Sequence, residues 1–257
     1  MHRPRPFLLL ATTASCGTPP PVVVVVLERE ADDTGFVGSE SHREADGIEL
    51  EGVTWTVDWN DEGLTPLDGG GWQVERADGS ALQLYEGWLV VYTLVLEPCE
   101  PAATRGTPPP HGYSTHPSRA PEPVALALHM LAPTALGTAT FPAEPFCDAG
   151  VTIFRGEDGN PGMPDDGSLD GLSFRMNGAL RRVAEAPWEP FEMQSHLSAE
   201  HDLPLVGTAD GTGAVDVVFS PAHLIDDISL DLEPDRIALG AIANLTKTAT
   251  ATLSTGP

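Results

Sequence analysis

Three histidines and one methionine are the side chains best suited to bind a transition metal. His111 and His116 lie in the proline-rich segment 98–123, and His129 and Met130 lie in a stretch that we expect to be a strand. Imidazole nitrogens are ligands for zinc and copper, and a thioether is a soft ligand that suits Cu(I). The sequence therefore predicts a copper or zinc site formed by the three histidines. The alternative is a solvated proline-rich loop whose histidines bind nothing.

The first cysteine carries the strongest indication of where the protein resides. Cys16 follows a leader with basic residues at Arg3 and Arg5, an apolar stretch over 7–14 and small residues at 14–15. This order is typical of a secretory signal, and it resembles the lipobox of bacterial lipoproteins. In those proteins the cysteine receives a lipid on its sulfur and becomes the new N-terminus. The alternative is a free cysteine after an ordinary cleaved signal.

This resemblance implies an exported protein with a lipid on Cys16 that anchors it to a membrane. The residue after the cysteine is Gly17 rather than aspartate. In organisms that sort lipoproteins by this residue, such a protein goes to the outer membrane. We expect an outer-membrane lipoprotein that faces either the periplasm or the cell surface.

The two remaining cysteines form an even pair in a protein expected to be exported. A disulfide between Cys99 and Cys147 is the default in an oxidising compartment. The alternative, two thiolates of a metal site, is weaker because neither cysteine belongs to a CxxC motif.

Acidic residues dominate the composition, with 38 Asp and Glu against 13 Lys and Arg and a formal net charge of −25. A surface this acidic repels nucleic acids and anionic lipid headgroups, so we expect no nucleic-acid partner. No run after the leader approaches the roughly 20 apolar residues that span a bilayer. The expected partners are the membrane, through the lipid, and a protein of the envelope.

The order of sequence patterns predicts four regions. They are a signal peptide over 1–15, an acidic tether containing Pro and Gly over 16–51, a β-sandwich domain over 52–247 and a Thr-rich tail over 248–257. The domain begins where apolar and polar residues alternate from residue 53 to residue 59, which is typical of a half-buried strand. Further short strands separated by Gly, Pro and Asp predict an all-β fold, a sandwich of the immunoglobulin type or a related one.

Helix is scarce in this prediction. A serine and a proline at Ser220 and Pro221 predict a short helix over 221–227. Apolar residues four apart predict a second helix over 234–247, with a strand as the alternative.

Other patterns with chemical potential are weaker. The acidic loop 158–170 has the oxygen ligands that calcium prefers, but it lacks the residues of an EF-hand. We expect His196 and His201 to face solvent and His223 to cap or pack in the short helix. The sequence contains no GxSxG, P-loop or HExxH motif, and we predict that the protein is not an enzyme.

Two Cys-bearing segments surround the His-bearing loop in a distinctive order. They read LVLEPC over 94–99 and FPAEPFC over 141–147, and the second runs into VTIF over 151–154. This order resembles uncharacterised lipoproteins of myxobacteria over about residues 52–232. More distantly, it is similar to the copper-binding partner proteins of methanobactin operons, the metallo-mystery pair family.

The resemblance implies a periplasmic β-sandwich that handles copper, although those copper proteins carry four cysteines in the domain. The expected function is therefore an envelope lipoprotein that binds copper or zinc through its His-bearing loop. The alternative is a non-catalytic structural or protein-interaction module of the envelope.

Overall fold

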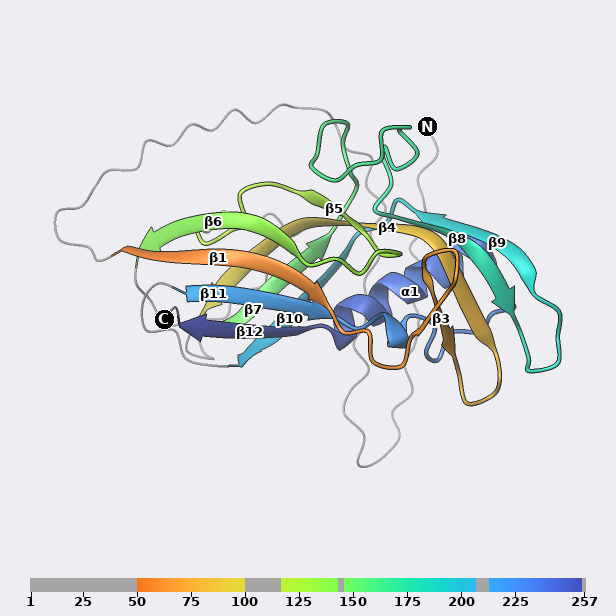
Figure 1. Ribbon diagram of the computed structural model, residues 1–257. Coiled ribbons are helices and arrows are strands. Elements are labelled where there is room, and N and C mark those ends of the chain that lie inside the picture. The colour runs from red at the N-terminus through yellow and green to blue at the C-terminus, as the bar shows by residue number, and fades with distance from the viewer. Residues whose placement is uncertain (1–49, 100–116, 143–145, 207–212, 256–257) are drawn as a thin grey trace, which may run out of the picture. The chain divides into compact units, whose positions relative to one another are not determined.

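The computed structural model of this 257-residue chain describes residues 50–99, 117–142, 146–206 and 213–255. All of the described residues belong to one compact unit. In the described part, the fold is built from strands with a single α-helix, so the all-β prediction is confirmed (Figure 1). The first six strands are β1 (Leu50–Trp59), β2 (Thr65–Pro66), β3 (Trp72–Glu75), β4 (Ala81–Pro98), β5 (Val124–Ala127) and β6 (Thr134–Pro142). The others are β7 (Phe146–Ile153), β8 (Phe174–Arg181), β9 (Glu189–Ser195), β10 (Ala199–Val206), β11 (Gly213–Phe219) and β12 (Thr250–Thr255).

Hydrogen-bonded neighbours form a continuous path of strands, in the order β2-β3-β4-β7-β10-β12-β11-β1-β6. Strands β5 and β8 also pair with β4, and β9 pairs with β8. The path has two halves, β2-β3-β4-β7-β10 and β12-β11-β1-β6. They meet at a short parallel contact, in which Leu205 of β10 lies opposite Ala251 of β12. Figure 1 shows β1, β11 and β12 side by side in one half, while β4, β8 and β9 belong to the other.

One hydrophobic core joins both halves of the path. Trp55 of β1, Phe219 of β11, Leu94 of β4 and Val151 of β7 are each fully buried in the same cluster. The alternation predicted for residues 53–59 is present, since the odd-numbered side chains are buried and the even-numbered ones are partly exposed. Burial of each large apolar side chain stabilises the fold by about 1.5–3 kcal/mol, so this shared core holds the two halves together.

The longest strand, β4, is the centre of the half that contains the candidate site. We predicted a strand over 88–96, but β4 has 18 residues and begins at Ala81. Its first part pairs with β3 on one side and β8 on the other, and its last part pairs with β7. The register of β4 against β8 shifts between Leu84 and Glu86, which marks a β-bulge.

The helices agree in part with the prediction. Residues Pro221–His223 form a single turn of 3₁₀ helix, which is shorter than the helix expected over 221–227. The second helix, α1 (Pro234–Thr248), has proline in its first turn and buries Ile237, Ala241 and Leu245, the apolar residues spaced by four. It packs against β9 and β10. Among the described residues, no helix is long and apolar enough to cross a membrane.

The C-terminal boundary of the domain was wrong in the sequence analysis. Residues 248–257 were expected to be a Thr-rich tail, but strand β12 pairs antiparallel with β11 and parallel with β10. Ala251 and Leu253 are buried while Thr252 is exposed, so the segment has the period of two that a strand requires. Threonine is β-branched and favours strands, which is why a polar segment belongs to the sheet. At the other end, β1 begins at Leu50, two residues before the predicted boundary at 52.

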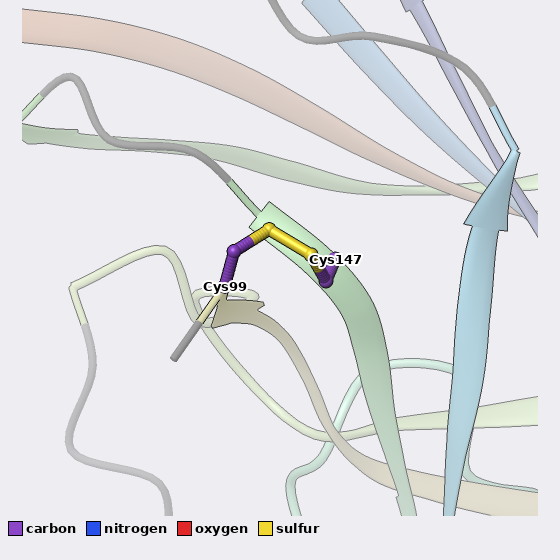
Figure 2. Close-up of a disulfide and its surroundings, with 2 residues drawn as sticks. All are labelled: Cys99 and Cys147. Carbon is purple, nitrogen blue, oxygen red and sulfur yellow. A yellow bond between two sulfur atoms is a disulfide. The ribbon is translucent and has the colours of Figure 1, made fainter. Parts of the chain in front are cut away.

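The predicted disulfide is confirmed. Cys99 and Cys147 are joined by an S–S bond of 1.97 Å, with their Cα atoms 4.9 Å apart. Figure 2 shows that the bond ties the residue after β4 to the start of β7. These two strands are already antiparallel partners, with Glu97 opposite Asp148. The covalent bond therefore fixes the end of a ladder that backbone pairing has brought together.

Candidate functional site

His129 is the one member of the predicted metal site that lies within the described residues. We expected it in a strand over 124–131, but β5 ends at Ala127 and the chain then turns. The amide of Met130 donates to the carbonyl of Ala127 at 3.1 Å, and Leu131 has a φ of 49°. His129 therefore stands in a tight turn, where successive side chains no longer alternate between two faces.

Buried groups on three sides hold this turn in place. The indole Nε1 of Trp72 in β3 donates to the carbonyl of Leu128 at 2.9 Å, and the amide of Leu128 donates to the carbonyl of Gly87 in β4 at 2.9 Å. On the far side of the turn, Nε1 of Trp59 donates to the carbonyl of Ala132 at 3.2 Å. Two indoles therefore satisfy turn carbonyls, which gives His129 a rigid support.

The imidazole of His129 is itself held against β4. Its Nδ1 lies 3.3 Å from the amide nitrogen of Gly87 and 3.2 Å from the carbonyl oxygen of the same residue. When Nδ1 carries no hydrogen, it accepts a hydrogen bond from the amide of Gly87. When Nδ1 carries a hydrogen, it donates to the carbonyl of Gly87. The ring also packs edge-on against Trp88, with ring centroids 5.5 Å apart. No described residue hydrogen-bonds to Nε2, so this nitrogen keeps its capacity to bind a metal or donate a proton.

An open pocket of about 320 Å³ lies beside this turn. Its walls come from the loop after β1 together with β2, from the turn into β3 with the first residue of that strand, and from the turn that carries His129, which is distant from them in sequence. The exposed wall is polar and apolar in about equal parts, with an imidazole and a carboxylate as its titratable groups. The lining residues are Asp61, Leu64, Pro66, Gly71, Trp72, His129, Met130 and Leu131.

A β-bulge next to this pocket exposes an aromatic ring that the sequence analysis missed. Tyr85 is the additional residue where the register of β4 shifts, and it is 51% exposed. Gly71, in the pocket wall, faces the bulge at close range. A Cβ on Gly71 would lie 2.0 Å from the carbonyl oxygen of Leu84 and 3.3 Å from Cα of Tyr85. The absence of a side chain at residue 71 therefore lets the bulge form and turn Tyr85 toward solvent.

His111 and His116 lie outside the described residues, so the three-histidine site stays a prediction. The segment that carries His116 joins the described structure at Pro117, and Ser118 follows in a fully buried position. The Oγ of Ser118 accepts from the amide of Leu96 at 3.0 Å, and its carbonyl accepts from the indole of Trp55 at 2.8 Å.

The described end of this loop and His129 contact different parts of β4. Ser118 hydrogen-bonds to Leu96, whereas His129 hydrogen-bonds to Gly87, nine residues earlier in the strand. At 3.3 Å for each residue of extended chain, that separation is roughly 30 Å. Among the described residues, no group of three or more His, Cys, Asp or Glu side chains is arranged to hold a metal.

The other candidates from the sequence have ordinary surroundings. In the acidic loop, Oδ1 of Asn160 accepts from the amide of Glu157 at 2.8 Å and Oδ1 of Asp166 accepts from the amide of Ser168 at 2.9 Å. These oxygens stabilise turns instead of converging on one point. Of the other described histidines, His196 is exposed, His201 is half-buried, and His223 is exposed with its Nδ1 2.7 Å from Oδ2 of Asp226.

The chain matches no protein-family profile, no curated protein and no solved structure. The resemblance to myxobacterial lipoproteins and to the metallo-mystery pair family therefore stays a prediction from the sequence.

Proposed function

We propose that this protein is an exported, lipid-anchored protein of the bacterial envelope whose β domain binds a partner and catalyses no reaction. The disulfide between Cys99 and Cys147 is the observation that carries the proposal. Disulfides of this kind persist in oxidising compartments and are rare in the cytosol. The leader before Cys16 supplies the route to such a compartment, and the acid-rich composition keeps the domain solvated close to the membrane.

The proposed architecture is a β-sandwich, of the immunoglobulin type or a related one. Its support is the single core that side chains from both halves of the strand path share. The parallel pairing of β1 with β11 distinguishes this strand order from a simple meander of antiparallel hairpins. A sandwich of this kind offers its outer sheet faces and loops for binding.

The lipid anchor is tested by replacing its attachment site. In cell fractionation, we expect the wild-type protein to sediment with membranes and to be released by detergent. The Cys16→Ser variant lacks the sulfur that carries the lipid, so it should appear in the soluble fraction or accumulate with its leader uncleaved. Ser15→Ala is the matched control, because it keeps a small residue before the cysteine, and it should stay in the membrane fraction. Equal membrane partitioning of wild type and Cys16→Ser, with the leader cleaved from both, would contradict the proposal.

Binding of copper or zinc is the second candidate function, and His129 is the observation that favours it. Its ring is held through Nδ1 at Gly87, its Nε2 has no described partner, and the thioether of Met130 lines the same pocket and is 66% exposed. A metal held here with His111 and His116 would bind neutral imidazoles, so protons compete with it.

For this second candidate, we expect calorimetry at pH 7 to detect one Cu²⁺ or Zn²⁺ for each chain. Binding should weaken as the solution is made more acidic, because protonated imidazole nitrogens cannot coordinate a metal. The variant His129→Ala and the double variant with His111→Ala and His116→Ala should each lose the metal. The exposed His196 offers the control, and His196→Ala should bind as the wild type does. Only millimolar or non-saturable binding by the wild type would exclude a metal function.

A further inference from the structure

Four neighbouring strands, β3, β4, β8 and β9, present a grid of amide, carboxylate and guanidinium side chains on their outer face. The register places Gln73 of β3 opposite Gln83 of β4. In the next row, Asn177 of β8 lies opposite Glu86 of β4 and Glu192 of β9. These side chains are half-buried or exposed, so their polar ends are accessible to a ligand.

Hydrogen bonds within the grid fix the orientation of its amides. Nε2 of Gln83 donates to Oε1 of Gln73 at 2.9 Å, and the hydroxyl of Tyr85 donates to Oε1 of Gln83 at 3.0 Å. In the second row, Nδ2 of Asn177 donates to Oε2 of Glu86 at 2.9 Å. These contacts leave other groups of the same side chains without a described partner: Nε2 of Gln73, Oδ1 of Asn177 and Oε1 of Glu86. The face therefore offers oriented donors and acceptors side by side.

The aromatic ring of Tyr85 is the apolar part of this face. The bulge exposes the ring, and the hydroxyl bond to Gln83 ties its far end back to the strand. A ring held in this way has little side-chain entropy left to lose when a ligand covers it. Its face is suited to the C–H groups on one side of a pyranose, while the adjacent amides and carboxylate suit the hydroxyls at the sugar's edge.

Charges on this face are largely compensated. A guanidinium nitrogen of Arg175 lies 3.2 Å from Oε1 of Glu192, and one of Arg181 lies 3.0 Å from Oε2 of Glu75. The formal charge of the whole chain, −25, opposes the approach of a polyanion. A ligand of this face should therefore be rich in hydroxyl groups and carry no negative charge.

We propose that the outer face of β3, β4, β8 and β9 binds a neutral polysaccharide, with Tyr85 stacking on a sugar ring and Gln73, Glu86 and Asn177 bonding to its hydroxyls. This inference rests on the proposed function, because it names the chemical class of the partner that the envelope protein binds. An extended sheet face matches a chain of sugars, which needs a long shallow surface instead of a closed cavity.

The test is affinity electrophoresis of the full-length protein in a zwitterionic detergent, since sugar-based detergents would compete. The gels contain xylan, hydroxyethylcellulose, mixed-linkage β-glucan or dextran, with polygalacturonate as the anionic comparison. We expect at least one neutral polymer to slow the wild type and polygalacturonate to have no effect. No retardation by any neutral polymer, or retardation by polygalacturonate alone, would overturn the proposal.

Variants then locate the binding surface. Tyr85→Ala should raise the dissociation constant about tenfold, the size expected from the loss of one aromatic contact. Tyr85→Phe keeps the ring and should bind within about threefold of the wild type, since it loses only the tie to Gln83. The control is Val206→Ala on β10, where an exposed apolar residue stands away from this face. Undiminished binding by Tyr85→Ala would refute the assignment of this face.

The two proposals fail in distinguishable ways. A protein that binds a neutral polysaccharide but carries no lipid on Cys16 would keep the binding face and lose the anchor. A lipid-modified protein that no neutral polysaccharide retards would keep the anchor and lose the binding face.

Discussion

Alanine at both Cys99 and Cys147 is expected to lower the free energy of unfolding by about 4 kcal/mol. The disulfide links residues separated by 48 positions, and its loss returns the entropy of that loop to the unfolded chain. For a domain of this size, the melting temperature should fall by about 8–16 °C. Thermal unfolding at pH 7, followed by circular dichroism, gives the melting temperatures of the variant and of the wild type.

The same experiment contains its own control. Wild-type protein treated with a thiol reductant should unfold at the temperature of the double alanine variant, because both lack the covalent link. A melting temperature unchanged by either treatment would show that backbone pairing of β4 with β7 holds this end of the domain without the disulfide.

Gly71→Ala is expected to destabilise the domain by at least about 3 kcal/mol, since the new Cβ combines steric overlap with an unfavourable backbone conformation. The Cβ would meet the carbonyl oxygen of Leu84 at 2.0 Å, and residue 71 has a φ of +79°. Relief of the overlap requires the bulge at Tyr85 to move, so polysaccharide binding should weaken as well. Urea unfolding gives the change in stability as a lower midpoint.

The neighbouring glycine separates these two causes. Gly70 has a φ of +92°, and a Cβ there would meet no atom within 4 Å. Gly70→Ala should therefore show only the conformational cost of about 1–2 kcal/mol. If the two variants were equally stable, close approach at residue 71 would not be what shapes the bulge.

The parts of the fold that could be predicted are those where local pattern and burial agree. Residues 53–59 alternate because one face of β1 lies on the core, and α1 places Ile237, Ala241 and Leu245 on one buried face. In both cases the spacing of apolar residues alone indicates the element. The disulfide between Cys99 and Cys147 was predictable for a different reason. With Cys16 assigned to the lipid, these were the two remaining cysteines of a protein expected to be exported.

The parts that could not be predicted depend on contacts distant in sequence. Strand β10 contains Glu200, Asp202 and Pro204, all exposed, so its sequence gives little sign of a strand until β7 and β12 flank it. The apolar run over 124–131 conceals the turn at His129, which hydrogen bonds from Trp72 and Trp59 support. The bulge that exposes Tyr85 depends on the close approach of Gly71, which lies in the turn before β3.

Mass spectrometry of the mature N-terminus tests the central claim, the lipid-anchored envelope protein, most directly. The protein is purified from membranes, digested, and its N-terminal peptide is sequenced. We predict a peptide that begins at Cys16 and carries a diacylglycerol on the sulfur. A peptide that begins upstream of Cys16, or one in which the thiol of Cys16 is unmodified, would contradict the claim.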